Sequence, residues 1–235
     1  MKNNSGFASF AGALILLGTV AVFPAVDSAT KAARGTAMKN RARGIWIAVV
    51  TANAEREIHD LSMLWPLDLE KENNKTFDSA EAYFTYLMSD GQGDKILRDP
   101  SERIVSDLRP EMVGGPGMKF EFKPGLRVLP PGSSAWHVVC VSDDDPADMP
   151  FLISRNVKVE DIRFPTEAEL ANPNDRASRL GLVKKGPSNR VVWIMKGGHT
   201  MDAMPSRATR ARLVPLAKPA GRAELKILPA LDAAP

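Results

Sequence analysis

The sequence predicts an α+β roll in which one long N-terminal helix packs on an antiparallel β-sheet. Small and apolar residues recur at helical spacing across residues 29–54, which indicates a helix with one buried stripe. In the second half of the chain, short runs rich in β-branched and aromatic residues stand between Pro, Gly and Asp/Asn clusters. Helical segments followed by strand segments are typical of the α+β class.

The N-terminal helix is expected to begin in an apolar segment and to continue into the globular part. Residues 7–26 carry no charge, and at about 1.5 Å per residue such a helix spans about the hydrocarbon core of a bilayer. We therefore expect a transmembrane anchor over 7–28 and a helix extension over 29–57. Gly35 and Gly44 weaken the helical propensity of the extension.

The head is expected to span residues 58–200, with short helices before the strands. Asp78 and Ser79 precede an apolar face in the manner of a helix N-terminus, and Glu81 adds an acid in the first turn. Residues 101–109 predict a second short helix, with its apolar side chains inward. The expected strands are 118–122, 136–141, 151–154 and 191–196.

The last segment, 201–235, has five prolines and no aromatic residue. It is therefore expected to form an extended tail that adds little to the core. Residues 225–228 are the exception, because their pattern suits one edge strand.

Charge and cysteine content exclude several function classes. The chain has 31 basic and 28 acidic residues, but five of the basic ones follow one another between residues 31 and 43. Without that run the balance is slightly acidic, so no basic face for nucleic acid is expected on the head. Cys140 is the only cysteine, which excludes an intramolecular disulfide and a cysteine-rich zinc site. It lies in an apolar run, as a core thiol does.

Catalytic patterns are missing from the sequence. His59, His137 and His199 are scattered, with no HExxH pair and no GxSxG elbow. A polar contact between strands is the simplest role for His137. We expect no enzymatic activity and no organic cofactor, because no site for a membrane-tethered enzyme can be named.

One acidic loop has ligand chemistry. Asp143, Asp144, Asp145 and Asp148 follow a predicted strand within six residues. Calcium takes six to eight oxygen ligands from carboxylates and carbonyls, so these four residues are a candidate metal site. The alternative is a solvated turn, in which Asp side chains bond to the nearby backbone.

The N-terminal segment carries a resemblance to a known family. It reads MKNNSGF, then an apolar helix, then a basic Ala-rich stretch leading to IWIAVVTAN at 45–53. This arrangement resembles the type IV pilin-like proteins of bacteria, specifically the pseudopilins of type II secretion. Segments 148–156 and 191–198 also resemble parts of one branch of that family. The likeness covers roughly residues 1–200.

The resemblance implies processing and assembly. A prepilin peptidase would cut between Gly6 and Phe7, releasing a leader of residues 1–6, and the new amino terminus would be methylated. The head would lie in the periplasm or at the cell surface, held to inner-membrane lipid by a single span. The partners would be other pilin-like subunits, which contact the chain through its N-terminal helix.

The sequence departs from the family at one assembly position. The glutamate that the family prefers four residues after the Phe is Ala11 here, and the anchor proline comes several residues early. In the family, that glutamate is thought to pair with the amine of a neighbouring subunit's first residue, here Phe7. Its replacement implies a minor or tip-located subunit.

Two matters stay open from the sequence. Five basic residues follow the anchor and only Lys2 precedes it, which by the positive-inside rule places the head in the cytosol rather than outside. A signal peptide cut near Ser28 would instead release a soluble periplasmic binding protein or adhesin. That protein is the alternative to an anchored pseudopilin-like subunit.

Overall fold

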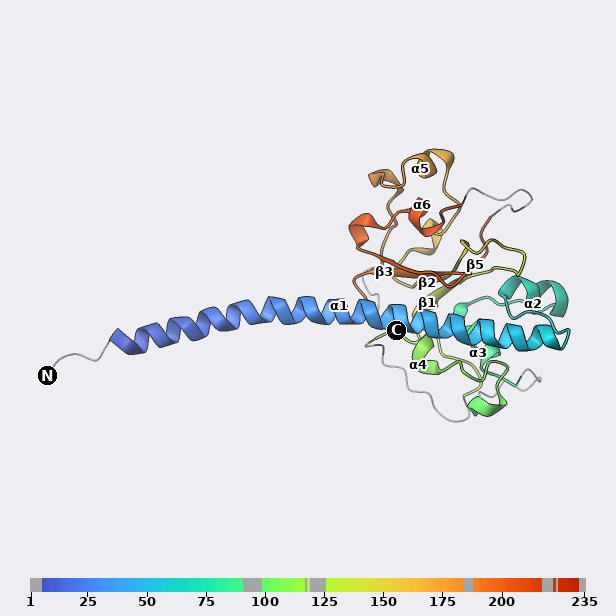
Figure 1. The fold of residues 1–235 in the computed structure, drawn as a ribbon, viewed down its shortest axis with the longest axis horizontal. Helices are drawn as coiled ribbons and strands as arrows, with labels where there is room; N and C mark the ends of the chain where they lie inside the picture. Colours follow the sequence, from blue (N-terminus) through green and yellow to red (C-terminus); the bar gives the residue numbers. More distant parts are fainter. Residues whose placement is uncertain are drawn as a thin grey trace.

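One helix of 53 residues, α1 (Gly6–Ile58), begins outside the head and ends within it. In the computed structural model its first part projects away from the head, and its last part runs across it (Figure 1). The structure describes residues 6–90, 99–116, 118, 126–183, 188–216, 222 and 224–232, with the side chains of α1 described from residue 28 onward. The fold class predicted from the sequence, a long helix on an antiparallel sheet, is confirmed.

The sheet is a five-stranded antiparallel one among the described residues, in the order β4-β3-β2-β1-β5. Its central strands are buried along their whole length, which agrees with their near-continuous apolar sequences. The strands are β1 (Trp136–Val139), β2 (Pro150–Ser154), β3 (Val191–Met195), β4 (Thr200–Ala203) and β5 (Ile227–Leu228).

The remaining elements are short. They are α2 (Pro66–Asn73), α3 (Ala80–Leu87), α4 (Pro110–Val113), α5 (Glu167–Ala171) and α6 (Arg210–Leu213), with 3₁₀ turns η1 (Pro100–Glu102), η2 (Val159–Asp161), η3 (Arg176–Ser178) and η4 (Pro205–Arg207).

The two faces of the sheet are covered by different parts of the chain. Trp136 and His137 are neighbours in β1, so their side chains point to opposite faces. The Trp136 indole donates to the carbonyl of Met112 in α4 at 3.1 Å, and the Met112 sulfur lies against Gly44 of α1. The His137 ring contacts the carbonyl of Val157 on the other side at 3.0 Å. Helices α1 and α4 therefore cover one face, and the segment around Val157 covers the other.

The core stripe of α1 follows the helical period that the sequence predicts. Met38, Ala42, Ile45, Val49 and Ala52 are buried against the sheet and α4. The two glycines inside the extension lie where a neighbour comes close. A Cβ on Gly44 would meet the Met112 sulfur at 3.2 Å, and one on Gly35 would meet the Arg190 side chain at 2.8 Å. At both positions a larger residue would require a flexible neighbouring side chain to move, which is a packing reason for a small residue.

Two predictions about elements are corrected by the structure. Residues 101–109 do not form a helix: after the turn η1, the amides of Ile104 and Val105 bond instead to the carbonyls of Ser89 and Leu87. Val105 and Leu108 are nevertheless buried. The last residue of α3 and the turn after it thus accept the backbone hydrogen bonds that a second helix would have used internally.

The expectation that residues 201–235 add little to the core is also wrong. Strand β4 extends through Ala203, the side chains of Leu213 and Val214 are buried, and Leu228 of β5 is 2% exposed. Strand β5 is the edge strand predicted at 225–228. The strand expected at 118–122 lies, apart from Met118, outside the described residues.

Candidate functional site

The sequence-predicted processing and assembly residues lie at the free end of α1. The helix begins at Gly6, and its side chains before residue 28, among them those of Phe7, Ala11 and nearly all of the anchor expected at 7–28, lie outside the described part of the chain. The first described side chains, 28–34, are all exposed. Among the residues that were described, no helix has a window apolar enough to cross a membrane.

One aromatic side chain of α1 packs on the head at one end of the sheet. The Trp46 indole nitrogen donates to the carbonyl of Lys196 at 2.7 Å, just after β3. The same indole lies over Gly198, where a Cβ would come within 2.7 Å of the ring. Gly198 has a φ of +88°, which favours glycine for a second reason. The turn from β3 to β4 is therefore shaped to accept one aromatic side chain of the helix.

The basic run that follows the anchor also docks the helix. Lys39 forms an ion pair with Asp202 of β4 at 3.2 Å, and Arg190 pairs with the other oxygen of the same carboxylate. The Arg41 guanidinium donates to the carbonyl of Gly114 at the end of α4. Two basic residues of the run, Lys39 and Arg41, thus make contacts within the molecule.

The acidic loop is closed by two basic side chains of the protein itself. One oxygen of Asp145 accepts from the amide of Ser142 at 2.7 Å, and the other forms an ion pair with Arg222. The Lys196 ammonium donates to the carbonyls of Asp143 and Asp145. The side chains of Arg222 and Asp145 are only 15% and 12% exposed, so little solvent screens this pair.

The other three candidate metal ligands do not form a ligand cluster among the described residues. Asp143, Asp144 and Asp148 are exposed, and the amide of Asp143 donates to the Asp68 carboxylate at 2.8 Å. Within the described residues, no three His, Cys, Asp or Glu side chains gather as a metal site would require. The loop forms a turn in which the amide of Asp145 donates to the carbonyl of Ser142 at 3.2 Å and the Asp145 carboxylate accepts from the amide of Ser142.

A buried carboxylate that sequence analysis does not single out as a site holds two distant segments together. Glu81 of α3 is 1% exposed. Its two oxygens accept from the amides of Ser134, before β1, and Leu231, after β5, both at 3.1 Å. Burial raises the pKa of Glu81, although these hydrogen bonds and Arg155 oppose the shift. Only the tertiary fold brings Ser134 and Leu231 to this helix.

The titratable groups of β1 and its end, His137 and Cys140, are held neutral by hydrogen bonds and burial. The amide of Ala230 donates to Nδ1 of His137 at 2.9 Å, so Nε2 carries the proton and donates to Val157. Burial lowers the pKa of His137, which keeps the ring neutral. Burial also raises the pKa of Cys140 to about 12, so its thiol stays protonated and unreactive. The prediction of a core thiol is confirmed.

A cavity of about 630 Å³ opens beside Glu81. Its wall combines the rings of Phe77 and Tyr86 with aliphatic groups that include Leu129 and Leu231. Phe77 packs edge-on against the buried Tyr83, with ring centres 5.4 Å apart. Phe77 thus connects one wall of the cavity to the core, and Leu231 of the C-terminal segment forms part of the wall as well.

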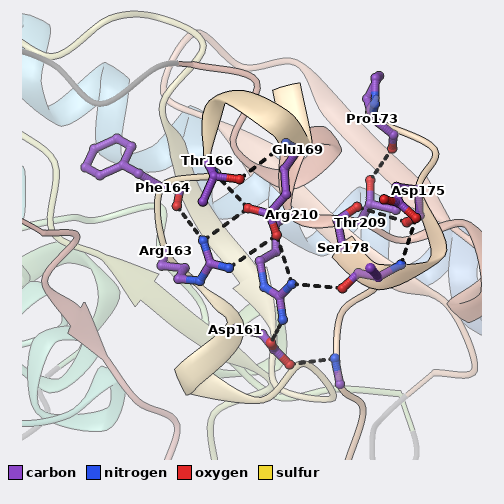
Figure 2. Close-up of polar contacts among 12 residues, drawn as sticks. Asp161, Arg163, Phe164, Thr166, Glu169, Pro173, Asp175, Ser178, Thr209 and Arg210 are labelled. Atoms are coloured by element: carbon purple, nitrogen blue, oxygen red, sulfur yellow. Dashed lines mark hydrogen bonds and ion pairs between the residues drawn. The ribbon is translucent and has the colours of Figure 1, made fainter. Parts of the chain in front are cut away.

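The segment that covers the His137 face is held by polar contacts. Figure 2 shows the Arg210 side chain between Asp161 and Glu169, and Arg163 against the same Glu169 carboxylate. Glu169 also completes a capping box with Thr166 at the start of α5. Burial raises the pKa of Glu169, but hydrogen bonds from Thr166, Arg163 and Arg210 outweigh it and lower the pKa overall. The spacing Thr166-x-x-Glu169 is a sequence signal from which α5 follows.

Comparison with family models, with characterised proteins and with solved structures found no match to this chain.

Proposed function

We propose that the chain is a membrane-anchored, pseudopilin-like subunit of a type II secretion or type IV pilus-like assembly. The observation that carries the proposal is α1, which runs unbroken from Gly6 to Ile58 and supplies the central stripe of the head's core. Its first part projects away from the head and would pack on the helices of other subunits, while its last part is fixed to the sheet (Figure 1).

The docking contacts support a mechanical role for the helix. Ile45 and Val49 are fully buried, and Trp46 and Lys39 tie the helix to the end of β3 and to β4. A force applied to the free part of α1 would therefore reach the sheet without an intervening hinge. Assembly of such subunits needs heterologous, non-closing contacts between helices, which generate a fibre rather than a ring.

Ala11 supports a minor or tip location within that assembly. A carboxylate buried in a bilayer is costly unless it is paired, so a glutamate at this position is useful only between subunits. With Ala11, this subunit offers no such acceptor to the amine of the subunit above it, and its addition beneath that subunit is weakened. A subunit at the tip has no subunit above it, and therefore loses least.

The intact mass of the mature protein tests the proposal. The chain would be co-expressed with a prepilin peptidase, and the membrane fraction would be analysed by mass spectrometry. We expect loss of residues 1–6, an added methyl group, and retention in the membrane. A soluble product that starts near Ala29 would overturn the proposal and support a periplasmic binding protein or adhesin.

A matched pair of variants makes the test specific. Gly6→Leu should keep its leader, because the peptidase cannot accept a large residue before the cut. Gly18→Leu makes the same change inside the apolar segment and should be processed like the wild type. Equal processing of both variants would contradict cleavage after Gly6.

A further inference from the structure

A cavity of about 360 Å³, open to solvent, lies beside η3, η4 and α6 and carries three exposed arginines. It is lined by Arg179, Arg207 and Arg212 together with Asn174, Ser206 and Thr209. Among these described lining residues there is no carboxylate. Like charges gathered in one cavity repel one another, so the arrangement favours the binding of an anion.

The neighbouring Arg210 has a structural role, and its charge is neutralised by acidic side chains. Arg210 is paired with both Asp161 and Glu169 (Figure 2). Within the described part of the chain, by contrast, Arg179 and Arg207 have no ion pair and no side-chain hydrogen bond. Arg212 donates to the Asn174 amide oxygen at 2.6 Å, which orients its guanidinium without neutralising it.

The backbone that carries these arginines is held in place. Arg179 and Thr209 are joined by an antiparallel bridge, and the Thr209 hydroxyl donates to the carbonyl of Pro173 at 2.7 Å. Leu180 and Ala208, the neighbours of that bridge, are buried and hydrogen-bonded to each other through the backbone. The backbone of the cavity is therefore ordered in advance, so an anion would have to order only the arginine side chains that bind it.

We propose that this cavity binds a phosphate group carried by an organic molecule. Guanidinium groups match the oxygens of phosphates and carboxylates in bidentate geometry. A single carboxylate offers two oxygens and one charge, whereas a phosphate offers several oxygens in different directions to Arg179, Arg207 and Arg212. The volume exceeds that of a bare ion and falls in the range of small-ligand sites, so the phosphate would enter with part of the molecule that bears it.

Titration of the full-length protein in a non-ionic detergent tests the proposal. Glycerol phosphate is the soluble probe, and a short-chain phosphatidylglycerol, compared with a diacylglycerol that lacks the phosphate, is the lipid probe. Ionic strength is held constant in chloride, and binding is followed by calorimetry and thermal shift. We expect saturable binding of one or both phosphate probes; preference for the first indicates a soluble ligand and preference for the second a lipid headgroup. No saturable binding of either would overturn the proposal.

Arginine variants assign the binding to this cavity. Arg207→Gln removes a charge but no hydrogen bond seen in the described structure, and should weaken binding about tenfold. Arg212→Gln should weaken it similarly. Arg176→Gln is the control, because Arg176 is an exposed arginine in η3 that does not line the cavity. Unchanged binding in both cavity variants, or equal weakening in the control, would contradict the assignment.

Discussion

The indole of Trp46 lies over Gly198, and its ring nitrogen donates to the carbonyl of Lys196 two residues earlier. The contact joins residues about 150 positions apart in the chain, one in α1 and one in the turn between β3 and β4. Gly198 serves it in two ways, because its φ of +88° forms the turn and its missing side chain makes room for the ring. The close packing of α1 on the turn between β3 and β4 therefore depends on a glycine at position 198.

Gly198→Ala should destabilise the head and loosen α1. The left-handed backbone alone costs about 1–3 kcal/mol for a residue with a Cβ, and displacement of the indole adds to this. Urea unfolding, followed by tryptophan fluorescence, measures the loss. Gly114→Ala is the control, since a Cβ there would meet nothing closer than 3.7 Å. Equal stabilities for the two variants would contradict the role of Gly198.

His137 should make the protein sensitive to mild acid. Its folded pKa is lowered by burial, so between that value and its ordinary pKa of about 6.5 the unfolded chain binds the extra proton. Stability is then lost as the pH falls below about 6.5, by at most about 1.4 kcal/mol per pH unit. Urea midpoints at pH 7.5, 6.5 and 5.5 test this.

His137→Gln is the comparison for that series, because an amide donates and accepts but does not titrate. It should flatten the pH dependence between 6.5 and 5.5 while lowering stability modestly at pH 7.5. If wild type and variant lose stability in parallel on acidification, His137 is not the group responsible.

Arg222→Gln should destabilise the acidic loop. It leaves the poorly exposed Asp145 carboxylate without its cation, at a cost of about 2 kcal/mol. Lys226→Gln breaks the more exposed pair with Glu70 and should cost less than about 1 kcal/mol. Thermal unfolding compares the two variants, and equal losses would contradict the assignment of Arg222 as the counter-ion.

Calcium decides between the two interpretations of the same loop. With Arg222 and Lys196 in place, the melting temperature should be the same in excess calcium and in chelator. A rise that depends on calcium and saturates would show that the folded state binds the ion. It would then support Asp143, Asp144, Asp145 and Asp148 as ligands.

Ala11→Glu should increase incorporation into filaments. The added carboxylate gives the amine of a neighbouring subunit its acceptor in the bilayer. The protein would be expressed with its cognate system, and its share of sheared filaments would be quantified before and after the change. Filaments made mainly of wild-type chain, or a variant that incorporates no better, would contradict the tip location.

Local pattern was sufficient for much of the fold. The helical stripe from Met38 to Ala52 and the apolar runs of β1, β2 and β3 are all buried as their periodicity predicts. The edge position of β5 also followed from sequence. These elements share one property: a few adjacent residues determine both which side chains are buried and which backbone geometry forms.

Elements that rely on distant partners could not be predicted in this way. Strand β4 has an intermediate and exposed pattern and exists because β3 offers its edge. The segment 101–109 has a helical apolar pattern, yet the amides of Ile104 and Val105 bond to the end of α3 and to Ser89 just after it. The local preference was outweighed because these partners become available only after the chain has folded.

The sequence by itself determined the α+β class, the long helix and the nature of its buried stripe, because periodicity and length act locally. Only the tertiary structure decided that Glu81 joins Ser134 to Leu231, and that Arg179 meets Arg207 and Arg212 in one cavity. Glu81 is far in the chain from Ser134 and Leu231, as Arg179 is from Arg207 and Arg212, and no spacing rule relates them. The chemistry of the arginines arises from their proximity and that of Glu81 also from the loss of water on burial, and both are products of the completed fold.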